Sequence, residues 1–281
     1  MPTEPLSILM TPAGARHLDA DGKLRRFLPR NTGSVLWVLA MTDFRTRYRG
    51  QQLGLTWSLL QPIAMMAILA KVLQSVARID VPHFPFYVLC GIIYWQFCSR
   101  IWSAATRTFF VKNDLAKRAT FRRYLMPIST VASHCVTGAI ECVLVLGVAI
   151  LMPGSLHFGW SWLVLPVLVS LLVLLLLSLS VLTATLCVFF RDIAFIVETL
   201  LAFLYWLTPV FYPPEALPRS MQILVQLSPF SALLISIRTV LMRGEFPDGS
   251  LLALDFLFPV LAFVASAMVY RAYESRLADQ L

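Results

Sequence analysis

The chain has 281 residues, of which 58% are hydrophobic and 14% are charged, and its mean hydropathy is +0.76. A soluble domain is closer to a quarter charged, so this composition excludes an ordinary soluble protein and predicts several membrane-spanning helices. The formal net charge is +8. Its basic residues lie beside apolar runs, so lipid headgroups are the expected counter-charge, and nucleic-acid binding is not supported.

Residues 1–30 contain scattered prolines and charges but no apolar core, which predicts a flexible cytoplasmic tail without a signal peptide. The next segment, "VLWVLAMTDFRTRYR", predicts an amphipathic helix lying along the cytoplasmic membrane interface. The apolar stripe of this helix consists of Trp37, Met41, Phe44 and Tyr48. The basic side chains expected to face the lipid headgroups are Arg45, Arg47 and Arg49. A simpler interpretation is that these arginines only keep the N-terminus on the cytoplasmic side of the membrane.

Six long apolar stretches follow, and they are expected to be helices because a helix satisfies its own backbone in lipid. The fold class is therefore an all-α integral membrane protein with one transmembrane domain over residues 31–275. The predicted spans cover about residues 55–77, 84–110, 128–152, 160–190, 193–212 and 251–270. Each half of the connection 213–250 is apolar but too short to span a bilayer. It predicts two short helices that separate near Ser228 and either re-enter the outer leaflet or pack on the span ends.

Lysines and arginines gather before the first span and between the second and third spans. Cytoplasmic loops carry an excess of these residues, so both termini are expected on the cytoplasmic side. The connection 213–250 is the exception, because it is expected outside and yet carries Arg219, Arg238 and Arg243.

The sequence offers little chemistry for catalysis. It has no GxxxxGK[ST] pattern for ATP, no HExxH or GxSxG motif and no Gly-rich dinucleotide fingerprint. The four histidines are scattered, and the five cysteines lie in apolar stretches without CxxC spacing. We therefore expect no metal, no cofactor in this chain and no enzymatic activity.

Two features inside the spans are unusual. Arg100 and Glu141 lie at similar depths in the second and third spans and are expected to pair, because isolated charges are costly in lipid. The second span is also rich in aromatic residues, which either stack on sugar rings in a channel or simply fill the core. The candidate channel residues are Tyr87, Tyr94, Trp95, Phe97 and Trp102.

The basic link "NDLAKRATFRRYLMP" is expected to form a short cytoplasmic helix that Asn113 begins. Without a P-loop in this chain, the energy for movement must come from a partner, and this link is a suitable contact for it. A basic loop that only sets topology is the simpler alternative.

Several segments occur together in an order that resembles a known family: "DFRTRYRGQQLGLTWSLLQP", "YVLCGIIYWQF", "NDLAKRATFRRYLMPIS", "FFRDI" and "TPVFYPPEALP". This arrangement is similar to the permease subunit of type-2 ABC exporters for polysaccharides such as O-antigen, capsule and teichoic acid. The resemblance covers about residues 31–275.

The resemblance implies a homodimer that works with two copies of a separate ATPase, on which ATP and Mg²⁺ bind. It implies export of a lipid-linked polysaccharide through the bacterial inner membrane, with gate helices in residues 213–242. It implies an interface helix over residues 35–49 and a coupling helix over residues 113–124. The residues expected to contact the ATPase are Asn113, Asp114, Leu115, Arg118, Ala119, Arg122, Arg191 and Asp192. An exporter of drugs or of another lipid is the alternative, and a membrane glycosyltransferase is disfavoured because an acidic catalytic motif is missing.

Overall fold

The structure, a computed structural model, describes residues 32–49, 54–76, 81–118 and 122–280. These residues form helices joined by turns and short links, without a strand among them, so the all-helical prediction is confirmed. The tail predicted for residues 1–30 lies outside the described residues.

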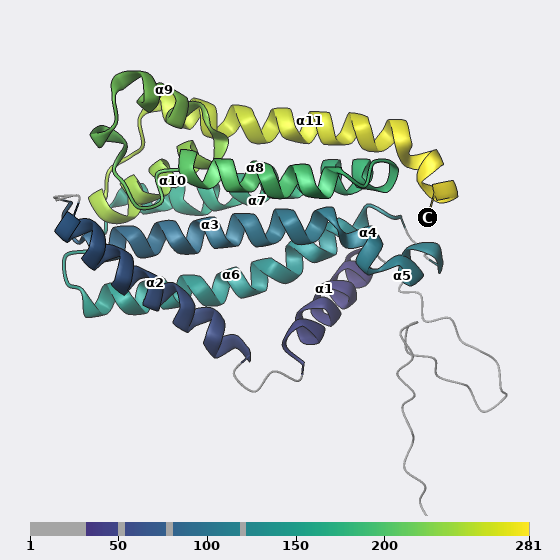
Figure 1. The fold of residues 1–281 in the computed structure, drawn as a ribbon, viewed down its shortest axis with the longest axis horizontal. Coiled ribbons are helices and arrows are strands. Elements are labelled where there is room, and N and C mark those ends of the chain that lie inside the picture. The colour runs from purple at the N-terminus through teal and green to yellow at the C-terminus, as the bar shows by residue number, and fades with distance from the viewer. Residues whose placement is uncertain (1–31, 50–53, 77–80, 119–121, 281) are drawn as a thin grey trace, which may run out of the picture.

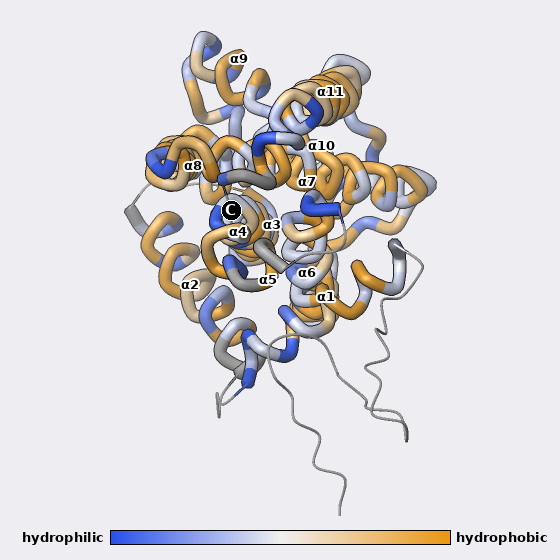
Figure 2. The backbone as a smooth tube through the Cα atoms, turned by 90° about the vertical axis from the view of Figure 1, so that its right-hand side faces the viewer, coloured by the Kyte–Doolittle hydropathy of each residue, from blue (hydrophilic) through white to orange (hydrophobic). Residues whose placement is uncertain are grey.

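The centre of the bundle is α3 (Phe84–Thr106), which contacts four other long helices. These are α2 (Gly54–Val76), α6 (Leu125–Leu151), α7 (Leu165–Phe189) and α8 (Ile193–Leu207). The end-on view in Figure 2 shows α3 surrounded by these neighbours, with apolar residues along most of the tube. A central helix of this kind must be apolar on the sides that pack against its neighbours.

The remaining elements lie at the periphery and at the two ends of the bundle (Figure 1). Along the side, α11 (Gly249–Gln280) packs on α7, and α1 (Thr32–Tyr48) packs on α6. One end, the α5 end, carries α4 (Thr108–Val111) and α5 (Asn113–Arg118). The opposite end, the α9 end, carries the short elements η1 (Trp160–Val164), η2 (Pro214–Ala216), α9 (Arg219–Leu227), α10 (Pro229–Arg238) and the π-helical turn η3 (Thr239–Arg243).

Among the described residues, four helices are long and apolar enough to cross a membrane. They cover Ser58–Ser75, Leu125–Leu151, Trp160–Phe189 and Gly249–Leu277. A fifth is added if α9 and the helix that follows it count as one span, although they meet at a bend of 97°. Such a bend occurs in a broken span or in a re-entrant loop, and re-entry from the outer leaflet stays a prediction.

Two of the six predicted spans therefore do not meet this length and composition test. The predicted fifth span is shorter than expected, because α8 has 15 residues and ends at Leu207, before Pro209. The predicted second span, α3, has 23 residues but includes the polar residues Gln96 and Arg100. The count of six spans remains a prediction, whereas the positions of the helices agree with the predicted stretches.

The core lies where α7 packs on α3. On α7, Leu168, Leu171, Leu172 and Leu175 recur at helical spacing and are buried. They join a large apolar cluster that includes Ile101 of α3. Such a stripe holds two helices at close range in lipid through van der Waals packing.

Close approach of the backbones at the α9 end depends on a glycine. Arg238 is 5% exposed and donates hydrogen bonds to the carbonyl oxygens of Pro209, Tyr87 (2.7 Å) and Val210 (2.6 Å). A Cβ atom added at Gly91 would collide with the Arg238 guanidinium and with the Val210 carbonyl. Because Gly91 has no side chain, the Arg238 guanidinium at the end of α10 and the Val210 carbonyl can lie directly against α3.

We expect Gly91→Ala to destabilise the protein by about 1–3 kcal/mol or more, because the Val210 backbone has little freedom to move away. The midpoint of thermal unfolding in detergent should fall. The matched control is Gly147→Ala on α6, where an added Cβ meets nothing within 4 Å, so its midpoint should stay equal or rise. Equal midpoints for the two variants would contradict the proposed close contact.

Candidate functional site

At the α5 end, the predicted coupling link begins as a short helix and packs against the bundle. Asn113 is exposed at the start of α5. Ala116 is fully buried in a cluster with Phe109, Met126 and Ala184, and Leu115 is half-buried against the same cluster. The Leu115 side chain therefore contributes to the contact of α5 with its own chain, and a contact of its exposed part with the ATPase stays a prediction.

The other predicted residues of this link are only partly described. The side chains of Asp114 and Arg118 and the whole of Ala119 lie outside the described residues. Arg122 is exposed in the non-helical segment that precedes α6. The described part of α5 covers Asn113–Arg118, and residues 122–124, at the end of the predicted coupling helix, are not helical.

The second predicted contact, the turn between α7 and α8, lies beside the first. Arg191 and Asp192 are both exposed, and the Arg191 guanidinium lies 5.8 Å from the centre of the Phe110 ring. Phe110 is 42% exposed and Val111 is 78% exposed, which is unusual for large apolar residues next to charged ones. The α5 end therefore presents a mixed apolar and basic surface in which Phe110 and Val111 of α4, just before the predicted coupling link, lie beside the second predicted contact at Arg191.

A polar network fastens α1 to the start of the coupling link. The Lys112 ammonium donates to the Asp43 carboxylate and, at 3.1 Å, to the Thr130 hydroxyl of α6. Burial lowers the pKa of Lys112, and the nearby Asp43 carboxylate opposes that shift. The side chains of Lys112 and Asp43 are 17% and 18% exposed. Three elements, α1, the link and α6, therefore meet at one largely buried ion pair.

Arg47 departs from the headgroup-facing prediction. Its guanidinium points toward α6 and lies 3.3 Å from the Ser133 hydroxyl and 3.1 Å from Nδ1 of His134. Burial lowers the pKa of Arg47, while Tyr48 and Asp43 oppose this effect. The physical reason is helix rotation: Arg47 is four residues after Asp43 and shares its α6-facing side. Arg45 and Arg49 are exposed, and their contact with headgroups stays a prediction.

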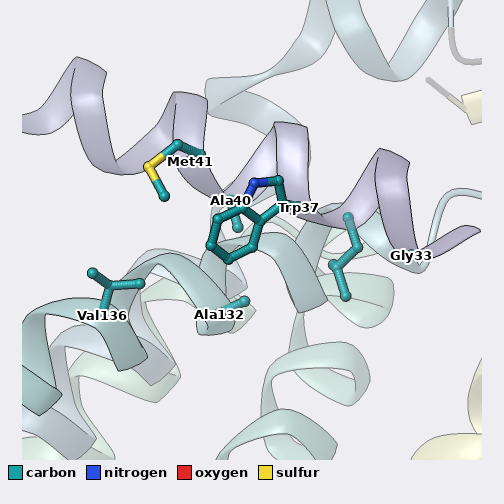
Figure 3. Close-up of a pocket in the computed structure, with 7 residues that line it drawn as sticks. Gly33, Trp37, Ala40, Met41, Ala132 and Val136 are labelled. Carbon is teal, nitrogen blue, oxygen red and sulfur yellow. The ribbon is translucent and has the colours of Figure 1, made fainter. Parts of the chain in front are cut away.

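The rest of the α1–α6 contact is apolar and loosely packed. Figure 3 shows a hollow between the two helices, with Trp37 and Met41 of α1 on one side and Ala132 and Val136 of α6 on the other. Gly33, Leu36 and Ala40 complete its lining. The Trp37 side chain is 64% exposed, so the predicted apolar stripe of α1 is not buried along its whole length. Apart from the Trp37 indole N–H, the side chains that line the hollow are apolar.

The structure brings Arg100 and Glu141 together. One guanidinium nitrogen of Arg100 donates to both carboxylate oxygens of Glu141, at 2.5 and 2.6 Å, and Nε donates to the Gln96 carbonyl at 3.0 Å. The Glu141 side chain is 1% exposed and that of Arg100 is 34% exposed. A buried carboxylate of this kind depends on its cationic partner.

The aromatic side chains proposed for a channel are mostly occupied by contacts within the chain. Tyr87, Tyr94, Trp95 and Trp102 are buried. The Tyr94 hydroxyl donates to the Phe230 carbonyl at 2.8 Å, and the Trp95 and Trp102 rings lie 6.1 and 5.7 Å from the Phe230 ring. These side chains hold α10 on α3 and leave little ring surface for a sugar. Phe97 is only half-buried.

Some residues of this framework were not predicted as site residues. Asp43 and Lys112 are separated by 69 positions, and the one signal for them is an acidic residue inside a basic segment. In the sequence, Arg238 stands out only as one of three arginines in a connection that is expected outside, where few basic residues are expected. A lone arginine within "ALLISIRTVLM" is a signal for a buried polar anchor, because such a charge is costly unless it has partners.

Comparison with known proteins decides the family. The profile of the ABC-2 type transporter family matches residues 34–242, which extend from α1 to η3. The chain belongs to the ABC-2 type transporter family. This family membership and the long apolar helices together make it a multi-pass membrane protein. The matched region includes the ion pairs Asp43–Lys112 and Arg100–Glu141.

Individual relatives of this transporter match along nearly their whole length. The O-antigen export system permease protein RfbA of Myxococcus xanthus is 27% identical over 249 residues, which cover 86% of this chain and 92% of the relative. The protein of the same name from Klebsiella pneumoniae is 23% identical over 211 residues, covering 75% and 81%. The polysialic acid transport protein KpsM of Escherichia coli is 22% identical over 252 residues, covering 84% and 92%.

In this transporter, we expect Arg100→Leu or Glu141→Leu alone to reduce the amount of folded protein, because an unpaired buried charge costs about 3–5 kcal/mol. The exchange of Arg100→Glu with Glu141→Arg should recover part of the loss. Yield and monodispersity in detergent measure the effect. As a control, Arg243→Leu or Glu215→Leu breaks an exposed pair and should change little. Additive losses in the exchange variant would mean that Arg100 and Glu141 do not stabilise one another.

Proposed function

We propose that the chain is the permease subunit of an ATP-driven exporter that moves a lipid-linked polysaccharide across the bacterial inner membrane. The observation that carries this proposal is the full-length similarity to the O-antigen and polysialic acid transport proteins, in addition to the family match. The chain is a transport subunit in this proposal, and the chemistry of ATP hydrolysis belongs to a separate protein.

The energy enters at the α5 end. The 281 residues contain no P-loop, so a separate ABC ATPase must bind ATP and Mg²⁺. In the working complex two copies of the chain combine with two copies of this ATPase. The surface around α5, Phe110 and Arg191 supports a contact with it, because exposed apolar side chains next to a cation are typical of a protein interface.

The orientation follows from charge. The α5 end, both termini and the basic segments face the cytoplasm, where lysine and arginine are enriched in the loops of membrane proteins. The α9 end then lies outside, and α9 and α10 form the outer gate of the transport path. Arg45 and Arg49 meet anionic headgroups of the inner leaflet.

The cargo is tested by removing the chain from cells that produce the polymer. Lipid-linked polysaccharide should accumulate inside while surface polysaccharide disappears, and an ATPase-dead partner should give the same result. Cells that keep normal surface polysaccharide but change their drug sensitivity or the distribution of another lipid would replace this cargo with the alternative one.

The Asp43–Lys112 ion pair is expected to transmit movement from the coupling link to α1. Asp43→Lys or Lys112→Asp should lower export about ten-fold, which corresponds to a coupling free energy of roughly 1.4 kcal/mol. The ATPase should still co-purify, because its contact surface is unchanged. The exchange variant with both substitutions should regain export, and Thr42→Lys, at an exposed position of α1, is the charge control. Full export by the single variants would reject this role.

A further inference from the structure

The central helix α3 has two different faces. One face is the aromatic and apolar side that contacts α7 and α10. The other carries a row of half-exposed polar residues at the spacing i, i+4 and i+7, and therefore on one side of the helix, and Arg107 follows directly after the last residue of the helix. We define the polar stripe as Gln96, Ser99, Arg100, Ser103 and Arg107.

The charges of the polar stripe are already neutralised within the chain. Arg100 pairs with Glu141 of α6, and Arg107 pairs with Glu198 of α8 at 2.7 Å. Ser103 also lies 3.3 Å from the Glu198 carboxylate. What remains at this surface is hydrogen-bonding capacity without net charge, since a guanidinium has five N–H donors and only some are used.

This surface is poorly suited to lipid. The side chains of Arg100, Arg107 and Glu198 are 34%, 42% and 49% exposed. Polar groups at membrane depth are stable where they face protein or a water-filled cavity, and they are costly against hydrocarbon. The exposed part of the polar stripe therefore requires water or a polar partner.

The polar stripe is also closed at one end. From Gln96 to Arg107 it rises ~17 Å, about half of a bilayer core, at 1.5 Å per residue. Toward the α9 end it stops, because residues 88–95 of α3 are all buried. In the same direction Phe230 of α10 covers Trp95, whereas toward the α5 end the helix α2 diverges from α3 (Figure 1).

We propose that the polar stripe is the wall of the transport path, and that it contacts a hydroxyl-rich carbohydrate chain entering from the α5 end. Sugar hydroxyls both donate and accept hydrogen bonds, which matches serine, glutamine and neutralised guanidinium–carboxylate pairs. A drug-like or acyl cargo would instead favour an apolar wall. Contact of α3 with α10 then closes the path at the α9 end. This inference rests on the proposed function for the nature of the cargo.

The first test measures water access. In a variant without the native cysteines, Ser99→Cys and Ser103→Cys are compared with Val143→Cys in inside-out vesicles holding the complete transporter. Val143 is 68% exposed on α6, two residues from the Arg100 partner Glu141, so it reports on the lipid-facing surface at similar depth. A membrane-impermeant methanethiosulfonate should modify the two stripe cysteines about ten-fold faster or more, since only a hydrated thiolate reacts. Equal modification rates for the stripe cysteines and Val143→Cys would overturn the proposal. It would also be overturned if the stripe cysteines cross-linked between two copies of the chain and were not labelled.

The second test measures passage of the cargo. Ser99→Trp should abolish polysaccharide export without reducing the amount of assembled complex, whereas Val143→Trp should export normally. If the stripe cysteines are labelled rapidly but Ser99→Trp exports normally, the stripe is exposed to water without being part of the transport path, and the proposal is rejected. A third outcome concerns the cargo alone. If the cysteines are labelled rapidly and Ser99→Trp blocks export of a non-carbohydrate cargo, while polysaccharide export does not depend on this chain, the path is kept and the carbohydrate cargo is rejected.

Discussion

The ion pair between Arg100 and Glu141 is the constraint on which the middle of the bundle depends, because lipid offers neither charge another partner. It sets the height and rotation of α3 relative to α6. That rotation directs the aromatic side of α3 toward α7 and α10 and directs its polar side between α8 and α6. A single central helix can thus pack its apolar side against α7 and α10 while its polar side pairs with charged groups of α6 and α8.

The α5 half of the bundle is organised by a second, smaller set of polar contacts. Lys112 joins α1 and α6 just before the predicted coupling link, and Arg47 and Tyr48 extend the contact along α6. Because the Asp43–Lys112 ion pair is largely buried, α1 and the start of the link cannot move independently without breaking it. A displacement applied to α5 would therefore be shared by α1 and by the first turns of α6.

The sequence was sufficient to predict the helices and the depth match of Arg100 and Glu141, because hydropathy and rise per residue act locally. It was not sufficient for the direction of individual side chains. Arg47 resembles Arg45 and Arg49 in sequence, but only Arg47 lies on the side that α6 covers. For the aromatic residues of α3 the sequence left a channel lining and core packing both open, and most of these side chains contact segments distant in sequence, as does part of Leu115. Those contacts depend on tertiary packing, which a charge count or a periodic pattern does not contain.

The anchoring of Arg238 has a consequence for biogenesis. The carbonyl groups of Pro209 and Val210, just beyond the end of α8, take their hydrogen bonds from a residue that follows Val210 by 28 positions. While the ribosome adds those residues, this end of a 15-residue helix has neither its guanidinium partner nor the cover of α10. Packing around the end of α8 can therefore be completed only after Arg238 has left the ribosome. A chain truncated within α10 should therefore be recognised by quality-control proteases as an unfinished membrane protein.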